Sequence, residues 1–296
     1  MVSLFGLFNS YRKYGLRNSL ALLRKSGELI LPNGFKLEFN SETRKDVKML
    51  YNFSVLYGVK FSKEAGYWNY DNGVLTTPQG IKFWIRGFNP VIFAETFLYD
   101  IHFCDFDLQD KAVIQAGAFI GDTPLYYAYR GATVYSFEPD VISFHIALEN
   151  MRLNPQLSKR VVLKNYAIGK DEYLDFPAKG SGSSSAYETT PNKTRVKSVS
   201  VTTILEEFNI SHPFLLDLDI KGKEFEVVHD PSLSKFQMVR IEYSTHIGHK
   251  KIGLRDEIIR ALKEHGFNRL RIYKHNEGKY DLNEHGTIEA KKMTIF

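Results

Sequence analysis

The stretch "KAVIQAGAFIGDTPLYYAYRGATVYSFEPD", residues 111–140, constrains the fold more than any other part of the chain. An apolar run, a glycine turn, a helical segment and a second apolar run follow one another, and an acidic residue ends the stretch. A helix that connects two buried strands in this way places them parallel and in one sheet. The stretch therefore predicts half of a nucleotide-binding α/β unit.

More apolar runs follow, namely "VVLKNYAIG", "PFLLDLDIK" and "MVRIEYS", with helical segments between them. Five such runs predict a parallel sheet that helices cover on both faces. The last two runs, "FNRLRIYKH" and "AKKMTIF", are joined by a polar stretch too short for a covering helix, so we expect an antiparallel pair. The predicted fold is a seven-stranded α/β sheet with a C-terminal antiparallel hairpin, over residues 109–296.

The first 108 residues have a different texture, that of a smaller α+β region. Turn residues at 32–34 and at 78–80 separate short alternating runs and predict two hairpins. Ser41 is a capping residue ahead of a helical segment. We find no catalytic constellation in this region.

The N-terminal 25 residues predict a helix in which basic residues interrupt an apolar stripe. The stripe consists of Phe5, Phe8, Leu16, Leu20 and Leu23. Such a helix packs on its own domain, which we favour, or lies on an anionic membrane surface. No apolar run reaches 18 residues, so a membrane span is not expected.

Composition limits the function classes. A net charge of +5 over 296 residues permits an anionic substrate and does not require a nucleic acid partner. A single cysteine, Cys104, excludes an internal disulfide and a cysteine metal cluster. We expect a cytoplasmic protein, with peripheral membrane contact through the N-terminal helix as the variant.

The segment "AKGSGSSSAYETTPNKTR", residues 178–195, is small and polar and predicts a mobile loop between the third and fourth strands. It is either a surface linker or a lid near the ligand, since loops on a rigid scaffold often carry function. The sequence leaves both interpretations open.

The glycine turn points to a cofactor with a ribose. Gly117 and Gly121 follow the first strand, where glycine lets backbone N–H groups approach a ligand closely. Glu138 ends the second strand about twenty residues on, where a carboxylate can accept hydrogen bonds from both ribose hydroxyls.

The same turn argues against a dinucleotide. A pyrophosphate site needs G-x-G-x-x-G at a helix N-terminus, whereas Ala118 follows Gly117 and the third glycine is missing. Asp122 and Thr123 open the helix, and a carboxylate there would repel a pyrophosphate. A positively charged cofactor with a ribose and no phosphate fits better, and S-adenosylmethionine is such a cofactor.

The order of motifs then becomes specific. "VIQAGAFIGDTPLYYAYRGATVYSFEPD", "LKNYAIG", "LLDLDIKGKEFEVV" and "VRIEYS" together resemble the FkbM-type family of S-adenosylmethionine-dependent methyltransferases. The pieces G-A-x-I-G-D-T and F-E-P are the most telling. The resemblance implies a class I methyltransferase (Rossmann-like) fold, S-adenosylmethionine as donor and a hydroxyl oxygen of a sugar or natural product as acceptor.

The resemblance also implies where the cofactor binds. The glycine turn would line its methionine end, Glu138 would hold the ribose, and Asp140 with residues 165–167 would border the adenine. The expected cofactor-binding residues are Gln115, Gly117, Ala118, Gly121, Asp122, Thr123, Glu138, Pro139, Asp140, Asn165, Tyr166 and Ala167.

The chain departs from the family pattern at two places. Gln115 stands where the family usually has an acid, and an amide accepts a hydrogen bond from the methionine ammonium without full charge pairing. We therefore expect weaker cofactor binding or compensation by Asp122. The usual K-x-D-x-E-G is "DLDIKG" here, with Asp217 and Lys221 nearly exchanging the charges, which can preserve a salt bridge and reverse its direction.

Methyl transfer is an in-line displacement that depends on positioning, and a hydroxyl acceptor benefits from a base. The candidate catalytic residues are Asp219 after the fourth strand and Glu242 with His246 after the fifth. Asp219 is favoured because it should face the methyl group; alternatively it is a structural acid. Asp217 and Asp219 share a strand face, but without a third ligand no metal is predicted.

Methylation of nucleic-acid amino groups would require Asn or Asp before Pro-Pro and an aromatic residue, which "DLDIKG" does not supply. Methylation of cytosine carbon needs a Pro-Cys nucleophile, and Cys104 lies in "HFCDF", outside the catalytic domain. We predict an O-methyltransferase acting on a carbohydrate, another glycan or a similar polar small molecule. N-methylation of a small amine would differ only in the acceptor pocket. The alternative from another class is a degenerate methyltransferase fold that serves as a non-catalytic binding or assembly module.

Overall fold

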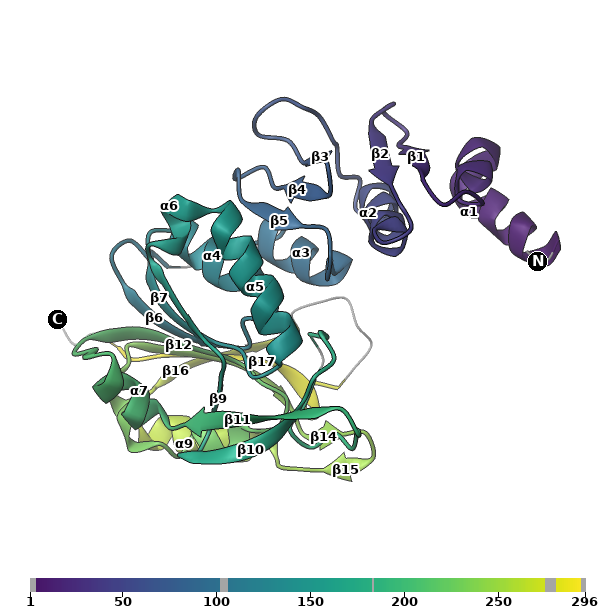
Figure 1. Ribbon diagram of the computed structural model, residues 1–296. Helices are drawn as coiled ribbons and strands as arrows, with labels where there is room; N and C mark the ends of the chain where they lie inside the picture. Colours follow the sequence, from purple (N-terminus) through teal and green to yellow (C-terminus); the bar gives the residue numbers. More distant parts are fainter. Residues whose placement is uncertain (1–3, 102–105, 183, 275–280, 294–296) are drawn as a thin grey trace. The chain divides into compact units, whose positions relative to one another are not determined.

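The computed structural model describes residues 4–101, 106–182, 184–274 and 281–293, without the side chains of residues 4–11 (Figure 1). The chain divides into two compact units, Met1–Tyr99 and Asp100–Phe296, called unit 1 and unit 2 below. Cys104 lies outside the described residues. The methyltransferase domain boundary at 108/109 stays a prediction.

Unit 1 is an α+β unit with two small antiparallel sheets. One pairs β1 with β2, and the other has the order β3-β4-β5. Both expected hairpins are confirmed. The elements are α1 (Leu4–Ala21), β1 (Gly27–Ile30), β2 (Lys36–Phe39), α2 (Arg44–Leu56), β3 (Asn69–Asp71), β4 (Val74–Thr76), β5 (Lys82–Trp84) and α3 (Pro90–Phe97).

Helix α1 is bent at Gly15, whose φ of 72° is left-handed. Its second half is attached to β1 through Asn18, whose side chain accepts from the Ile30 N–H at 2.8 Å and donates to the Ile30 carbonyl at 3.0 Å. Three residues of the expected apolar stripe are largely exposed, at 62%, 48% and 50% for Leu16, Leu20 and Leu23. These three leucines are therefore not the packing face that we favoured. Phe5 and Phe8 have no described side chains.

Helix α2 begins at Arg44 with Thr43 as its N-cap, so Ser41 is not the capping residue. Asn40 instead accepts from the backbone N–H groups of Glu42 and Thr43, at 2.9 and 3.0 Å. In the part of the chain that the structure describes, no helix has the length and apolar content needed to cross a bilayer.

Unit 2 is built on a seven-stranded sheet of order β16-β17-β13-β12-β6-β7-β8. The strands from β13 to β8 are parallel, and β17 is antiparallel to both of its neighbours. The predicted fold is confirmed. Its strands are β6 (Ala112–Ala116), β7 (Thr133–Phe137), β8 (Val161–Lys164), β12 (Pro213–Asp219), β13 (Met238–Ser244), β16 (Arg269–Tyr273) and β17 (His285–Lys291).

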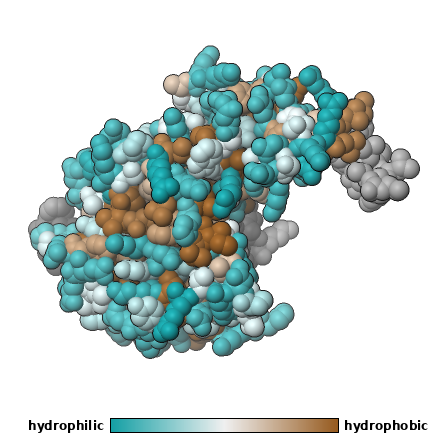
Figure 2. Space-filling view, viewed as in Figure 1, coloured by the Kyte–Doolittle hydropathy of each residue, from teal (hydrophilic) through white to brown (hydrophobic). Residues whose placement is uncertain are grey.

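Helices cover both faces of this sheet (Figure 1). One layer contains α4 (Asp122–Tyr129), α5 (Val141–Leu153) and α6 (Pro155–Ser158); the other contains α7 (Val201–Glu207), α8 (Glu224–Val227), the 3₁₀ turn Pro231–Lys235 and α9 (Arg255–Glu264). Polar residues cover most of the face shown in Figure 2, and apolar residues form smaller patches between them.

Two expected strands differ in extent. The run "VVLKNYAIG" is divided at Asn165 into β8 and β9 (Tyr166–Ile168), and β9 belongs to a second sheet with β10 (Glu172–Pro177) and β11 (Lys193–Val199). The last strand, expected from residue 290, starts at His285, because "HGTIEAK" pairs in register with β13. A short hairpin of two-residue strands, β14 (His246–Ile247) and β15 (Lys250–Lys251), follows β13.

The two faces of the large sheet differ chemically. The face under α7 and α9 is apolar, with Ile114, Leu216 and Ile241 fully buried in the main core. The face under α4 carries a line of buried polar residues, each paired in register with the next. This polar row consists of Ser136, Gln115, Asp217, Arg240 and Glu289.

Side chains of the polar row pair with one another and with neighbouring residues. Asp217 and Arg240 form a buried ion pair, and Tyr127 of α4 donates its hydroxyl to Asp217 at 2.6 Å. Glu289 pairs with Arg271 at 3.2 Å. Removing either partner of such a buried ion pair is strongly destabilising, because it leaves the other charge buried alone.

Candidate cofactor and active site at the carboxyl edge of the sheet

The glycine turn after β6 is built by close backbone approach. Gly117 has φ 91°, and a Cβ there would lie 2.2 Å from the carbonyl oxygen of Asp219. Its N–H and that of Ala118 donate to the Phe137 carbonyl, at 2.9 and 3.1 Å. Gly121 has φ 88° and caps α4, where a Cβ would meet the tip of Met151 at 3.2 Å. Only glycine fits at position 117 without moving backbone.

Glu138 folds back from β7 onto this turn. One carboxyl oxygen accepts from the Phe119 N–H at 2.7 Å and the other from the Asp140 N–H at 2.8 Å. Burial raises the pKa of Glu138 to about 8; the two backbone bonds lower it and the carboxylate of Asp219 raises it further. A carboxylate has about four acceptor positions, so the side chain can still accept from a ligand. Its ribose contact stays a prediction.

Asp122 has acceptor capacity left over at the start of α4. Thr123 donates its hydroxyl to one carboxyl oxygen at 3.2 Å, and the other oxygen, Oδ1, is buried with no hydrogen-bond partner among the described residues. Burial raises the pKa of Asp122 to about 6. A buried acceptor without a partner is uncommon and calls for a donor from a ligand or from water.

Gln115 is held inside the sheet. Its Nε2 donates to the Gly117 carbonyl at 2.9 Å, and its Oε1 accepts from the Ser136 hydroxyl. The amide therefore supports the glycine turn from below. The contact with a methionine ammonium that the sequence suggested would share Oε1 with Ser136 and stays a prediction. Asp122 offers the freer acceptor.

Asp140 is committed to two structural tasks. One oxygen caps α5 by accepting from the Ile142 N–H at 2.9 Å. The other accepts from the N–H groups of Lys179 and Gly180, at 3.1 and 2.7 Å. The 178–192 loop is thus attached to the start of α5. Ser185 attaches it at a second point, donating to the Lys221 carbonyl at 2.8 Å. The lid and the surface linker both stay predictions for this loop.

The residues expected near the adenine are placed by packing. Asn165 donates to the carbonyls of Glu138 and Pro139, at 2.7 and 3.1 Å, and so connects the end of β7 to the start of β9. The Tyr166 ring lies 6.3 Å from the Phe137 ring, centroid to centroid. Ala167 is buried in the small core of the second sheet. Their cofactor contacts also stay predictions.

The ends of β12 and β13 carry a three-membered charge group. The Lys221 ammonium lies 3.1 Å from Glu242 and 3.9 Å from Asp219. Glu242 is only 12% exposed, whereas Asp219 is 43% exposed and open to a ligand. Partial burial and the Glu242 carboxylate raise the pKa of Asp219 to about 7, while Lys221 lowers it. The exchanged charges of "DLDIKG" pair with other residues: Lys221 with Glu242 and Asp219, and Asp217 with Arg240.

The other acid of that motif, Asp217, has a different role. It is fully buried against Arg240 and is not available as half of a metal site. No group of three or more metal-ligating side chains occurs among the residues with described positions.

A histidine that the sequence did not suggest lies beside Glu242. His285 of β17 places Nε2 3.9 Å from Glu242 and Nδ1 2.8 Å from the Ser244 hydroxyl, and burial lowers its pKa. His246 is exposed on β14, with Nδ1 2.9 Å from Thr245. His285 is distant in the sequence, so only the pairing of β17 with β13 could have revealed it.

Glu224 was also missed. It is fully buried and accepts from the backbone N–H groups of Gly222 and Ser244, which joins the turn after β12 to the end of β13. Burial raises its pKa to about 8. Its sequence signal, an acid two residues after a glycine, is too common to single it out.

The strand order, the glycine turn and the acid after β7 define a class I S-adenosylmethionine-dependent methyltransferase. The model of the methyltransferase FkbM domain matches residues 115–269, slightly over half of the chain. The chain belongs to this family, and its cofactor is S-adenosylmethionine.

Solved structures resemble the chain only distantly. The N-terminal domain of human METTL16 in complex with SAH is 14% identical, with 97% of this chain and 94% of that chain covered and a TM-score of 0.44. The putative transferase PH0793 from Pyrococcus horikoshii is 15% identical, with 97% and 98% covered and a TM-score of 0.44. Magnesium protoporphyrin IX methyltransferase from Synechocystis PCC 6803 is 13% identical, with 69% and 78% covered and a TM-score of 0.38. No curated protein sequence matches the chain.

The residues at the edge fit this cofactor. S-adenosylmethionine carries a sulfonium and an ammonium, and the edge offers the carboxyl groups of Asp122, Glu138 and Asp219, of which Asp219 lies 3.9 Å from the Lys221 ammonium. The unpartnered oxygen of Asp122 suits an ammonium donor.

Proposed function

We propose that this methyltransferase methylates a hydroxyl oxygen of a carbohydrate or a similar polar metabolite. The observation that carries the proposal is Asp219, a half-exposed carboxylate with a raised pKa at the end of β12. A base with a pKa near the working pH is the most effective at removing a hydroxyl proton during attack.

Bound S-adenosylmethionine would supply an electrophilic methyl group on its sulfonium. Asp219 would hold the acceptor hydroxyl and take its proton as the oxygen attacks. Lys221, at 3.1 Å from Glu242 and 3.9 Å from Asp219, would limit how far the pKa of Asp219 rises. Glu242 would position Lys221, and His246 would contact the acceptor from β14.

We propose that the cofactor lies along the glycine turn, with Asp122 at the ammonium and Glu138 at the ribose. The buried, unpartnered Oδ1 of Asp122 supports the first contact, and the free acceptor capacity of Glu138 supports the second. The proposed contact set is Gln115, Gly117, Ala118, Gly121, Asp122, Thr123, Glu138, Pro139, Asp140, Asn165, Tyr166 and Ala167.

We propose a cytoplasmic protein that does not act on nucleic acid and whose α1 touches a membrane surface. Exposed Leu16, Leu20 and Leu23, with Arg17 between them and Arg24 and Lys25 directly after them, support the membrane contact. Sedimentation with vesicles containing anionic lipid tests it. Leu16→Ser with Leu20→Ser should abolish co-sedimentation, and co-sedimentation unchanged by this double substitution would refute it.

Two measurements test the methyltransferase proposal. Calorimetric titration with S-adenosylmethionine and S-adenosylhomocysteine should give micromolar binding, and NAD should give none. Transfer of labelled methyl groups is then measured on a panel of methyl glycosides. Asp219→Asn should retain cofactor affinity and lower turnover about 10²–10⁴-fold, whereas Asp256→Asn, an exposed acid on α9, should change neither.

The outcomes separate the alternatives. No binding of either sulfur ligand would favour a non-catalytic binding or assembly module. Loss of cofactor binding in Asp219→Asn would make Asp219 a structural acid. Transfer to small amines in place of glycosides would refute the hydroxyl acceptor.

A further inference from the structure

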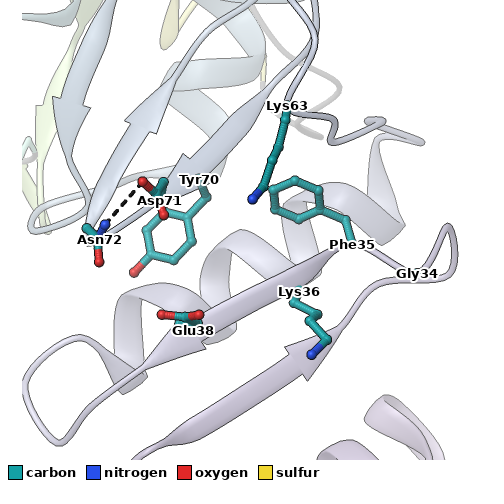
Figure 3. A pocket seen from close by; sticks show the side chains of 8 residues that line it. All are labelled: Gly34, Phe35, Lys36, Glu38, Lys63, Tyr70, Asp71 and Asn72. Carbon is teal, nitrogen blue, oxygen red and sulfur yellow. Dashed lines mark hydrogen bonds between the residues drawn. The ribbon is translucent and has the colours of Figure 1, made fainter.

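Unit 1 contains a cavity of about 280 Å³ that the methyltransferase site does not use (Figure 3). It lies against the outer face of β2 and is closed by β3 and the turns beside both strands. Two aromatic residues, two lysines and two acids line it: Phe35, Tyr70, Lys36, Lys63, Glu38 and Asp71. Its volume is close to the lower end of the range for small-molecule sites.

The aromatic side chains give the cavity fixed walls. Phe35 packs on Phe61 with ring centroids 5.6 Å apart, and Tyr70 is only 5% exposed. Burial, with smaller contributions from Glu38 and Asp71, raises the pKa of Tyr70 to about 12. Its hydroxyl therefore stays protonated at neutral pH and can both donate and accept.

The charges of the cavity balance and are partly unpaired. Among the residues that the structure describes, neither Lys63 nor Glu38 forms an ion pair, whereas Lys36 pairs with Glu28 at 3.0 Å. Figure 3 shows the Tyr70 hydroxyl directed toward Glu38 and the Lys63 ammonium beside the Phe35 ring. Donors and acceptors thus face the same space from opposite sides.

We infer that this cavity binds a neutral polyhydroxylated ring, that is, one unit of a saccharide. A hydroxyl both donates and accepts, so one ring can donate to the carboxylates of Glu38 and Asp71 and accept from Lys63. A simple anion would be repelled by those carboxylates, and a simple cation by Lys63. The aromatic walls suit the C–H faces of a sugar ring.

The inference goes beyond the proposed function. The cavity belongs to unit 1 and shares no residue with the cofactor edge of unit 2, so it would bind a saccharide whether or not unit 2 methylates one. A protein with both sites would hold a glycan independently of the reaction.

Ligand-observed saturation-transfer NMR of the full chain tests the inference, with the methyl glycosides of glucose, galactose, mannose and N-acetylglucosamine as probes. At least one should bind. Its dissociation constant should rise about tenfold or more in Glu38→Ala and in Lys63→Ala, because each removes a charge-assisted hydrogen bond. Asp219→Asn should leave this binding unchanged, which separates the cavity from an acceptor site on unit 2.

Matched controls are Glu42→Ala and Lys60→Ala, exposed residues of unit 1 outside the cavity lining. Tyr70→Phe removes only the hydroxyl and keeps the wall, so a weaker affinity in that variant does not reflect unfolding. The inference is overturned if no glycoside binds, or if the binding is insensitive to the cavity variants. Binding of glycine or of inorganic phosphate in place of the glycosides would also overturn it.

Discussion

The two halves of the carboxyl edge use their acids differently. On the cofactor side, Glu138 accepts from backbone N–H groups within the β6–α4 turn and the β7–α5 turn. On the acceptor side, Asp219 and Glu242 share one lysine side chain, Lys221. The position of Glu138 is therefore fixed by main-chain geometry. Asp219 and Glu242 are held by ion pairs with one flexible lysine side chain, which can shift between them. We expect the cofactor half to be intolerant of change and the acceptor half to be tunable.

The largest expected effect comes from Gly117→Ala. The alanine Cβ would lie 2.2 Å from the Asp219 carbonyl oxygen, and φ 91° is strained for alanine. The free energy of unfolding should therefore fall by about 3 kcal/mol or more. Urea denaturation measures this, and cofactor binding should be lost as well. Gly121→Ala is the matched control and should cost less, because the tip of Met151 can move.

Next in size is Glu138→Ala. Losing a charged group's hydrogen bond to the ribose should weaken S-adenosylmethionine binding by about 1.5–3 kcal/mol. Calorimetry measures the affinity, and Glu149→Ala, an exposed acid on α5, is the control. An unchanged dissociation constant would refute the proposed hydrogen bond between Glu138 and the ribose.

The pH dependence of stability should distinguish Glu138 from an ordinary surface acid. Its pKa is raised from 4.5 to about 8 in the folded state, so the folded protein binds the extra proton between these values. The contribution of this group to the free energy of unfolding is therefore present below pH 4.5 and is lost as the pH rises to about 8. Glu138→Gln should flatten the stability profile in that window, as measured by urea denaturation at several pH values.

Cofactor affinity should change with pH in the opposite direction to this stability contribution, because the cofactor is positively charged. It favours the ionised carboxylate, so affinity for S-adenosylmethionine should rise with pH and binding should release protons near neutral pH. Titration in two buffers of different ionisation enthalpy measures the release. Equal heats in both buffers would contradict it.

The smallest effect is expected for Lys221→Met. Lys221 lowers the pKa of Asp219, so its removal should shift the acidic limb of the rate–pH profile to higher pH. Lys223→Met removes a nearby lysine that pairs with Glu226, and should leave the profile in place. A rate–pH profile that does not move in Lys221→Met would contradict the proposal that Asp219 takes the proton of the acceptor.

Local sequence predicts the glycine turn well. The spacing of Gly117, Gly121 and Glu138 follows from the geometry of a single turn, and the structure brings these three residues together. The parallel strands could be predicted for the same reason, since each is a short apolar run between turn signals, whereas β17 ("HGTIEAK") is more polar and its start was expected at residue 290.

The acceptor half and the anchors depend on contacts between distant residues. Asp140 binds the 178–192 loop 40 positions further on, and Tyr127 reaches Asp217 across 90 positions. His285 meets Glu242 only because β17 pairs with β13 in one register. No local pattern encodes such distances, so Asp140 was expected to be only a ligand neighbour and the role of His285 was missed.

The polar row across the sheet favours the native register of five strands over misaligned registers during folding. Strand side chains alternate between faces, so a one-residue slip of β12 would send Asp217 into the apolar layer, and a two-residue slip would separate it from Arg240. Either error isolates a buried charge, at a cost of several kcal/mol. An apolar row would tolerate such slips far better. The buried acids and bases therefore raise the free energy of misaligned states relative to the native one.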